Sequence, residues 1–290
     1  MPNASTNGWV SDFAELVKAQ LTLLVLVTTA VGFYMGAPPR FAPLALFHAV
    51  FGTALAAGGA AALNQWWECR LDALMSRTKS RPIPGGRMSP ALALSLGGFL
   101  SLAGVIYLAR ACNSLSATLA AVTVLLYVLG YTPLKRISTT NTLIGAIPGA
   151  IPPLIGWAAV RGELGPGAWS LFIIMFFWQM PHFFALAWKY RADYKRAGFR
   201  MISSDDESGA RSSSQSVLFC MLLLIVSGFP FYVHLTSAAY LFCAVALGSG
   251  FIVMAMRFHR EKTPKSAQDL FLTSIIYLPL LMAVLVFTKV

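Results

Sequence analysis

Three polar side chains at four-residue intervals close a long apolar stretch of this chain. They are Asn64, Glu68 and Asp72. On a helix, residues four apart share nearly the same face and lie about 6 Å apart along the axis. Two carboxylates and an amide form an oxygen-only ligand set that suits Mg²⁺ or Mn²⁺. We interpret the stripe as a metal site, because carboxylates at a membrane are costly and usually functional. The alternative is a helix end that simply enters water.

A second acid, Asp193, stands in another polar loop, within residues 189–213. If that loop lies on the same membrane face as the triplet, Asp193 would complete a two-sided acidic mouth. Such a mouth would hold a second divalent ion against a diphosphate. By itself, Asp193 would be an ordinary solvated loop acid.

Basic side chains accompany both groups of acids. Cations stabilise the negative charge that develops on a departing diphosphate. For each one taken singly, the topology of a membrane protein explains it better. The residues concerned are Arg77, Lys79 and Arg81, which follow Asp72, and Lys135 and Arg136, which follow Tyr131.

The composition places these residues in a membrane protein. Of 290 residues, 57% are hydrophobic and 11% are charged, with a mean hydropathy of +0.67, whereas a soluble domain has about 25% charged residues. Too few charges remain to cover a water-facing surface, which predicts one polytopic membrane domain over residues 1–290. The net charge of +11 does not indicate nucleic-acid binding, because the basic residues lie in short loops between apolar segments.

Nine apolar segments are long enough to cross a bilayer, which needs roughly 20 helical residues. Backbone groups in lipid must pair within a segment, and strand-like alternation is missing, so an all-α bundle is expected. Residues 1–17 form a polar and amphipathic lead-in, expected to lie at the interface from Trp9 onward. The segments are 18–36, 41–66, 90–109, 112–133, 142–160, 167–188, 214–234, 238–258 and 267–288.

The distribution of Lys and Arg predicts the orientation. Eighteen of them fall on the side of the N-terminus and of every second loop, and four fall on the opposite side. We therefore expect a cytoplasmic N-terminus and an outer C-terminus. The two longest polar loops, 67–89 and 189–213, then share the cytoplasmic face, which predicts that the chemistry occurs there. A bacterial plasma or inner membrane is the expected location.

Together these motifs resemble the intramembrane prenyltransferase superfamily of the UbiA type, and within it the branch that prenylates haem. The similarity covers about residues 15 to 285. It rests on the Asn64, Glu68 and Asp72 stripe, on Arg77 and Arg81, on Tyr131 to Arg136, on Trp178 to Trp188, and on the loop with Asp193.

The resemblance implies nine helices around a lipid-open cavity, with a capped polar site on the cytoplasmic side. It implies transfer of a farnesyl group from farnesyl diphosphate to a vinyl group of haem b, with a haem A synthase or a terminal oxidase assembly as a further partner. Asn64, Glu68, Asp72 and Asp193 would hold Mg²⁺ or Mn²⁺ and act as the catalytic residues. The residues implied in diphosphate binding are Arg77, Arg81, Lys135, Arg136 and Lys189.

Two positions depart from the superfamily pattern. Glu68 stands where many relatives have Asp, which lengthens the ligand arm. Lys189 stands four residues before Asp193, where a second Asp is usual. This puts a symmetric two-metal clamp in doubt, and we expect Lys189 to neutralise diphosphate charge in place of an ion.

His182 follows Pro181 within the sixth segment. Proline frees a backbone carbonyl and bends the helix, so the imidazole next to it could face the cavity. It is either a buried histidine bonded to a neighbouring helix or a haem contact, conceivably an iron ligand. Tyr131 and Trp178 are further candidates for lining the cavity, although tryptophan is also common at membrane interfaces.

Two other functions fit parts of the sequence. A prenyltransferase of the same superfamily that acts on an aromatic or quinone precursor would share the first motif. A transporter would also have many helices interrupted by proline and glycine. Against a transporter, the carboxylates lie at one face instead of the midplane, and the sequence shows no internal repeat.

Overall fold

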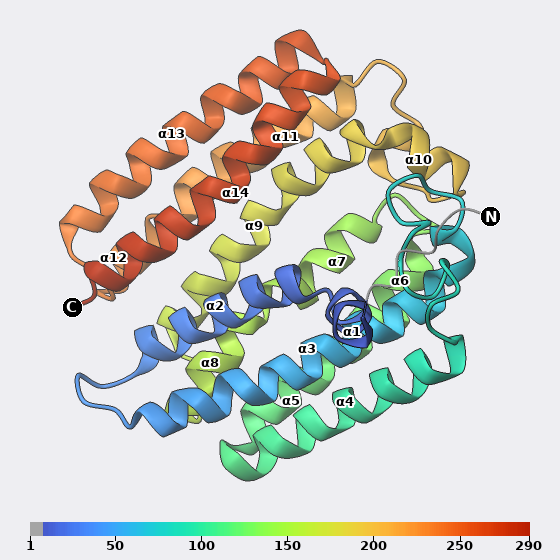
Figure 1. Ribbon diagram of the computed structural model, residues 1–290. Helices are drawn as coiled ribbons and strands as arrows, with labels where there is room; N and C mark the ends of the chain where they lie inside the picture. Colours follow the sequence, from blue (N-terminus) through green and yellow to red (C-terminus); the bar gives the residue numbers. More distant parts are fainter. Residues whose placement is uncertain (1–7) are drawn as a thin grey trace.

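The computed structural model describes residues 8–290, and this part of the chain is almost entirely helical. Within it, nine helical stretches are long and apolar enough to cross a membrane, which confirms the number predicted (Figure 1). Residues 1–7 of the predicted lead-in lie outside the described residues. The elements are α1 (Trp9–Leu16), α2 (Ala19–Gly36), α3 (Pro43–Asp72), α4 (Pro90–Ala111), α5 (Ser114–Leu125), η1 (Leu126–Tyr131), α6 (Thr132–Leu134), α7 (Asn141–Ala150), α8 (Pro152–Arg161), α9 (Pro166–Lys189), α10 (Arg191–Arg196), η2 (Ile202–Ser204), α11 (Ala210–Val226), α12 (Phe229–Tyr232), α13 (Ala238–Glu261) and α14 (Pro264–Phe287).

The second predicted segment continues further than its apolar part. The sequence predicted its end at residue 66, but α3 runs to Asp72. Pro43 opens it at the first helical position, where the missing N–H costs nothing. The polar triplet is therefore helical throughout, as its spacing required.

Three of the nine stretches are interrupted. The fourth changes from α5 into a π-helical turn, η1, and then into the single turn α6. The fifth breaks between α7 and α8, where Pro152 and Pro153 begin the second piece. Proline cannot donate to the preceding turn, which explains the break at this point. The seventh breaks between α11 and α12.

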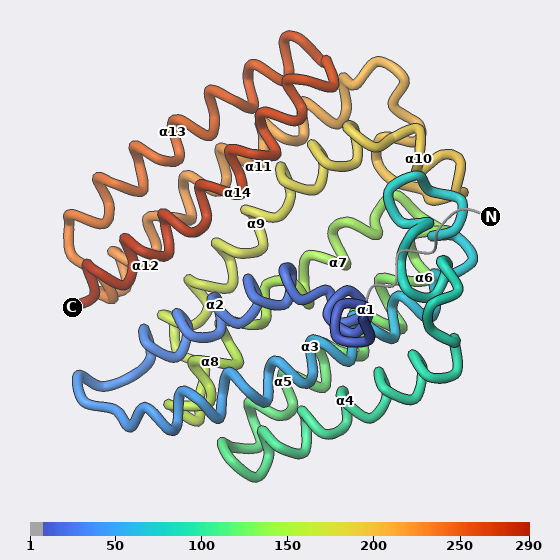
Figure 2. The backbone as a smooth tube through the Cα atoms, in the orientation of Figure 1, coloured from blue at the N-terminus to red at the C-terminus, as the bar shows by residue number. Residues whose placement is uncertain are grey.

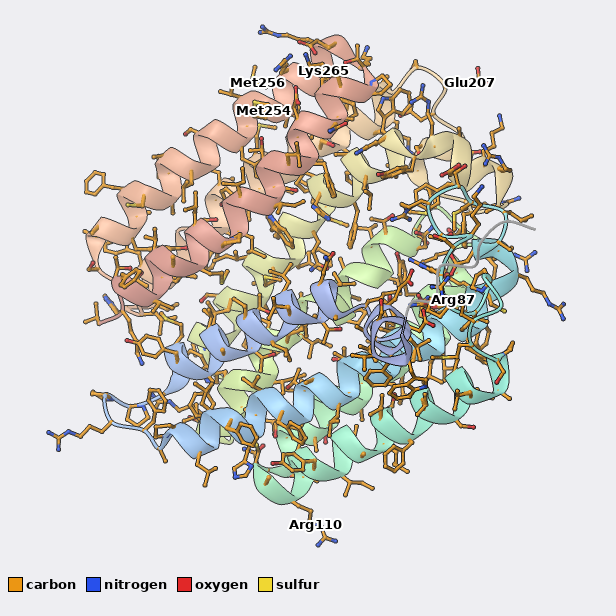
Figure 3. All side chains as sticks on the ribbon, in the orientation of Figure 1. Arg87, Arg110, Glu207, Met254, Met256 and Lys265 are labelled. Carbon is orange, nitrogen blue, oxygen red and sulfur yellow. The ribbon has the colours of Figure 1, made fainter. Side chains whose placement is uncertain are left out.

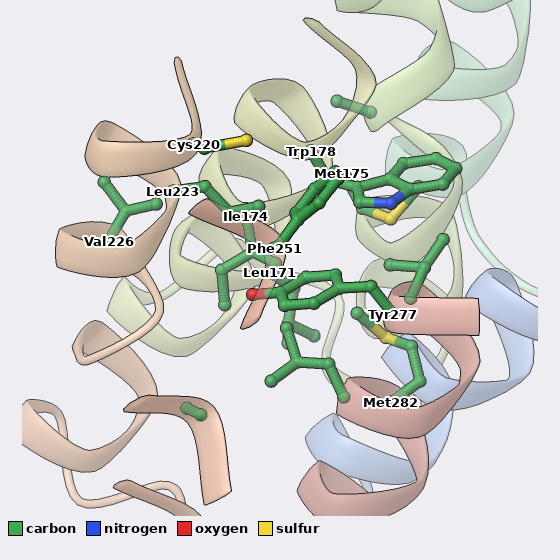
Figure 4. Close-up of a cluster of buried hydrophobic side chains, with 14 of the residues drawn as sticks. Leu171, Ile174, Met175, Trp178, Cys220, Leu223, Val226, Phe251, Tyr277 and Met282 are labelled. Carbon is green, nitrogen blue, oxygen red and sulfur yellow. The ribbon is translucent and has the colours of Figure 1, made fainter. Parts of the chain in front are cut away.

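The helices form a bundle in which α9 runs through the middle (Figures 1 and 2). Helices α11 and α14 pack on one side of it, with α13 packed against both of them. Helices α2, α3, α4, α5 and α8 lie toward the other side. A core of buried side chains, among them Leu171, Trp178, Phe251 and Tyr277, joins α9 to α13 and α14 (Figure 4). The loop 73–89 and α10 lie at one end of the bundle, while the end of α14 lies at the other.

Glycine allows two of these helices to touch through their backbones. A methyl group built on Gly156 of α8 would collide with the Thr29 carbonyl oxygen of α2, and one on Gly32 would collide with that of Pro153. Close approach through small residues is a usual way of packing membrane helices. The fifth stretch therefore packs tightly against α2 at this interface.

Candidate functional site

The polar triplet of α3 lies on one buried stripe. Asn64 is fully buried, and Glu68 and Asp72 are 4% and 1% exposed. Their spacing of four residues places them on one face of α3, as the sequence predicted. Burying two carboxylates is costly unless each has a partner, so both require a cation or a hydrogen-bond donor nearby.

A basic side chain meets each member of the stripe. Lys135 Nζ lies 2.8 Å from Glu68 Oε1, and Arg81 Nη1 lies 2.7 Å from Asp72 Oδ2. Lys18 Nζ donates to Asn64 Oδ1 at 2.6 Å. The predicted association of Arg81 and Lys135 with the acids is therefore a direct contact. Lys18 was counted only as a topological charge in the sequence and is a residue that the motif search missed.

The helix α1 carries Lys18 to the site. Gln65 Nε2 donates to the carbonyl oxygens of Glu15 and Leu16, at 2.7 and 2.9 Å. Arg87 reaches the same helix, with ion pairs to Asp12 and Glu15 at 2.7 and 2.9 Å (Figure 3). The lead-in is thus fastened to α3 and to the loop after it. No signal in the sequence linked Arg87 to these acids, because they are more than seventy residues apart.

The backbone at Lys18 is left-handed, with φ of 49°. This region costs of order 1 kcal/mol for a residue other than glycine, and the turn between α1 and α2 requires it. Burial, with Arg81 and Lys135 nearby, lowers the pKa of Lys18 to about 7. Several positive groups therefore converge at the end of the stripe.

The π-helical turn η1 supplies the opposite wall. Tyr127 OH accepts from Lys18 Nζ at 3.3 Å, and the Tyr131 ring lies 4.4 Å from Lys135 Nζ. Thr132 Oγ1 accepts from Asn64 Nδ2 at 3.0 Å and donates to the Tyr127 carbonyl at 2.8 Å. A π-helical turn often marks a functional site because it changes which side chains face inward. Tyr131 thus lies beside the stripe, and its predicted place in the cavity wall stays a prediction.

The Glu68 carboxylate stabilises the charged form of Lys135. Burial alone would lower the pKa of Lys135, but the adjacent Glu68 carboxylate outweighs this and raises it above its usual value. Lys135 is therefore an ammonium ion throughout the physiological range. Its only solvent-shielded countercharge in the described site is Glu68.

The stripe has the chemistry of a divalent-cation site. Asn64, Glu68 and Asp72 offer oxygen atoms only, which suits Mg²⁺ or Mn²⁺. Asp72 Oδ1 is buried without a hydrogen-bond partner among the described residues, and such an atom is expected to have a ligand. These residues fit the predicted ion. Between residues 8 and 290, however, no three His, Cys, Asp or Glu side chains gather closely enough to hold a metal by themselves.

The loop with Asp193 meets the loop after Asp72. The guanidinium of Arg77 lies 5.0 Å from the Tyr190 ring and donates to Tyr194 OH at 3.3 Å. Arg196 Nη1 donates to Ser76 Oγ at 3.1 Å. The two polar loops therefore lie side by side, as expected for two loops on the same face of the membrane.

Asp193 itself pairs with Arg196 at 3.2 Å, within α10. Its predicted role as a metal ligand opposite the stripe stays a prediction. Arg136 is solvent-exposed, and the Lys189 ammonium lies over the rings of Tyr190 and Phe271, at 5.0 and 5.9 Å. Their predicted contact with a diphosphate stays a prediction too.

His182, the predicted haem contact, and Trp178, a predicted cavity-lining residue, lie on α9 where it faces α14. Trp178 is 4% exposed, and its indole N–H donates to the Ser274 carbonyl at 2.9 Å. His182 is half-buried, and its Nδ1 lies 2.7 Å from Ser274 Oγ. His182 is therefore a histidine bonded to a neighbouring helix, one of the two arrangements expected from the sequence. Its Nε2 atom has no hydrogen-bond partner among the described residues.

Comparison with known proteins assigns the chain to a family. The model of the UbiA prenyltransferase family matches residues 25–281. The chain is similar to a protein named protoheme IX farnesyltransferase from Solibacter usitatus, with 40% identity over 93% of this chain and 96% of the relative.

Solved structures share the architecture. The chain is similar to a structure described as digeranylgeranylglyceryl phosphate synthase, with a TM-score of 0.80 and 15% identity over 96% of this chain and 98% of that one. It is also similar to a UbiA homologue from Archaeoglobus fulgidus bound to GPP and Mg²⁺, with a TM-score of 0.67 and 14% identity over 95% of this chain and 99% of that one. At these identities, the likeness establishes the fold.

Proposed function

The chain belongs to the UbiA prenyltransferase family, and from this premise we propose that it transfers a farnesyl group from farnesyl diphosphate to a vinyl group of haem b. Support for the acceptor and donor comes from the Solibacter usitatus relative, whose name specifies protoheme IX and farnesyl. The product would be haem O, which carries a hydroxyethylfarnesyl substituent.

One observation carries the proposal for the donor site: each polar group of the α3 stripe is buried against a basic side chain. A diphosphate needs both a divalent ion and basic donors, and this arrangement offers both at one place. Asn64, Glu68 and Asp72 would hold Mg²⁺ or Mn²⁺, with Asp193 as a fourth ligand from the adjoining loop. The ion would neutralise charge on the diphosphate as it leaves. The Archaeoglobus homologue was solved with GPP and Mg²⁺, which supports such a pairing here.

The basic groups then act on the leaving group. Arg81 and Lys135 would donate to the diphosphate oxygens, and we add Lys18 to the residues that the motifs indicated. Because these donors are fixed before the reaction, they stabilise the developing charge without reorganising. The C–O bond to the farnesyl group breaks with its electron pair on the diphosphate.

The remaining allylic cation would be captured by the electron-rich vinyl group of the acceptor. Water then adds to the cation on the porphyrin side and loses a proton, which gives the hydroxyl of the product. The apolar walls of the bundle would exclude water until that step. We place the reaction at the cytoplasmic face of a bacterial plasma membrane, on the distribution of basic residues.

Pigment analysis tests the whole proposal. Membranes that contain the chain are supplied with haem b, farnesyl diphosphate and Mg²⁺, and extracted pigments are examined by mass spectrometry. We expect a haem heavier by one farnesyl and one hydroxyl group. A matched control is Lys79→Met, which removes an exposed charge from the same loop and should leave the yield unchanged. Prenylation of hydroxybenzoate with haem left unmodified would refute the proposed acceptor, and no prenylated product at all with any acceptor would favour transport.

A further inference from the structure

The seam between α9 and α14 holds an imidazole that the donor site does not use. The ring of His182 lies 5.2 Å from the Trp178 ring on its own helix and 4.7 Å from the Phe271 ring on α14, inclined to them by 27° and 32°. Two flanking rings and a hydrogen bond to Ser274 fix its plane. An imidazole held so firmly in a membrane helix requires a reason.

The hydrogen-bond chain on α14 determines which ring nitrogen carries the proton. Ser274 Oγ has one hydrogen, and it donates to the Phe271 carbonyl oxygen at 2.5 Å. We assign this hydrogen to the Phe271 carbonyl, so that the hydroxyl accepts from His182 and Nδ1 bears the proton. In the neutral imidazole, Nε2 is then left with its lone pair free. The described residues provide no hydrogen bond to Nε2.

This arrangement is the one that iron-ligating histidines use. Such a histidine donates its other N–H to a fixed acceptor, which sets the tautomer and raises the basicity of the ligating nitrogen. Here that acceptor is Ser274, itself held by Phe271. We propose that His182 Nε2 ligates the iron of the acceptor haem, with Ser274 as a positioning residue. This inference rests on the proposed function, because haem enters as the substrate.

The helical position of His182 suits an acceptor inside the bundle. Helix α9 contacts α14 through Trp178 and α7 through Gln179, whose amide donates to the Ala146 carbonyl. His182 lies about 40° around the helix from Trp178, within the arc between these two contacts. That arc lies between the α14 side and the α7 side of α9, the two helices that flank it (Figure 1).

Lys189 continues the same seam toward the end of α9. It lies seven residues after His182, about 10 Å along the axis, and it shares the Phe271 ring as a neighbour. Haem carries two propionates at one edge, and a cation about this far from the iron ligand is placed to pair with one of them. We therefore assign Lys189 to the acceptor carboxylate instead of to the diphosphate, where the sequence had placed it.

Spectroscopy of the purified protein with haem b tests the iron ligand without requiring turnover. The ferrous complex of the wild type should show an iron–histidine stretching band in resonance Raman spectra. In His182→Gln the band should disappear, haem affinity should fall at least about tenfold, and added imidazole should restore ligation. The matched control is His48→Gln, since His48 is a membrane histidine bonded to Tyr107. Its spectrum should equal that of the wild type.

Two further measurements separate ligation from a structural role. Ser274→Ala should keep haem bound but move the iron–histidine band to lower frequency, because the Nδ1 acceptor is lost. Iron-free protoporphyrin IX should bind wild type and His182→Gln equally. An unchanged band in His182→Gln would overturn the proposal, and so would equal weakening of protoporphyrin binding.

Esterified haem tests Lys189. Lys189→Met should weaken binding of haem b about tenfold but leave binding of its dimethyl ester unchanged, because the ester has no propionate charge. The control is Lys195→Met, an exposed lysine of α10. Weaker binding of farnesyl diphosphate, with haem binding intact, would overturn this assignment. If His182 ligates haem but no prenylated product forms, only the proposed function is refuted. If His182→Gln forms product and keeps the wild-type spectrum, only this inference is refuted.

Discussion

Substitution of Lys135 by methionine should destabilise the protein and stop the reaction for two separable reasons. The side chains of Lys135 and Glu68 are 14% and 5% exposed and lie 2.8 Å apart. Removal of one partner from a buried pair costs about 3–5 kcal/mol, because the other charge stays buried without compensation. Lys18 lies close enough to influence Glu68, so we expect the lower end, about 3 kcal/mol. Loss of one donor to the developing charge should also reduce kcat by about 10²–10³.

The double variant Lys135→Met/Glu68→Gln distinguishes these effects. A neutral pair of similar size needs no countercharge, so stability should return to near the wild type. Activity should not return, because both the cation and a metal ligand are gone. The assays are thermal unfolding in detergent and single-turnover conversion of farnesyl diphosphate.

Either of two results would refute this reasoning. If Lys135→Met unfolds at the wild-type temperature, the Glu68 carboxylate is not left uncompensated. If the double variant recovers activity together with stability, the pair is a structural link between α3 and α6 and takes no part in catalysis. Lys79→Met again serves as the control, since that exposed side chain carries the same charge.

Four shorter predictions concern the metal, the second loop, pH and topology. Chelation by EDTA should abolish activity and Mg²⁺ or Mn²⁺ should restore it; full turnover in chelator would exclude a divalent ion. Asp72→Asn should slow the reaction about 30- to 1000-fold. Asp193→Asn should slow it by a similar factor if the second loop completes the site, and by less than about twofold if it does not. Burial would raise the pKa of Asp206, but backbone hydrogen bonds at the start of α11 lower it overall. Its stabilising effect should therefore be present above about pH 4 and fade as pH falls further, so Asp206→Ala should lower the melting temperature at pH 7 and match the wild type in acid. A reporter fused after Val290 should be active outside the cytoplasm and one inserted within 203–214 inside; the reverse result would break the predicted orientation.

The sequence alone determined the membrane architecture. Apolar segments of about 20 residues can only be helices in lipid, so their number followed directly from the printed chain. The spacing of Asn64, Glu68 and Asp72 determined that they share a face, because helical periodicity is local. These features depend on neighbours within a few residues.

Partners distant in the chain were decided only by the tertiary structure. In the sequence, Lys18 indicates only the membrane orientation. In the structure, Gln65 fastens α1 to α3, and this contact places the Lys18 ammonium at Asn64. The π-helical turn η1 has no periodic signal in the sequence, and its Tyr131 ring packs directly on Gly145 of α7. The tautomer of His182 required Ser274, ninety-two residues later. Local pattern places a side chain on a helix face, but only the packing of whole helices decides which other side chain it meets, and at this site that contact sets the charge and the chemistry.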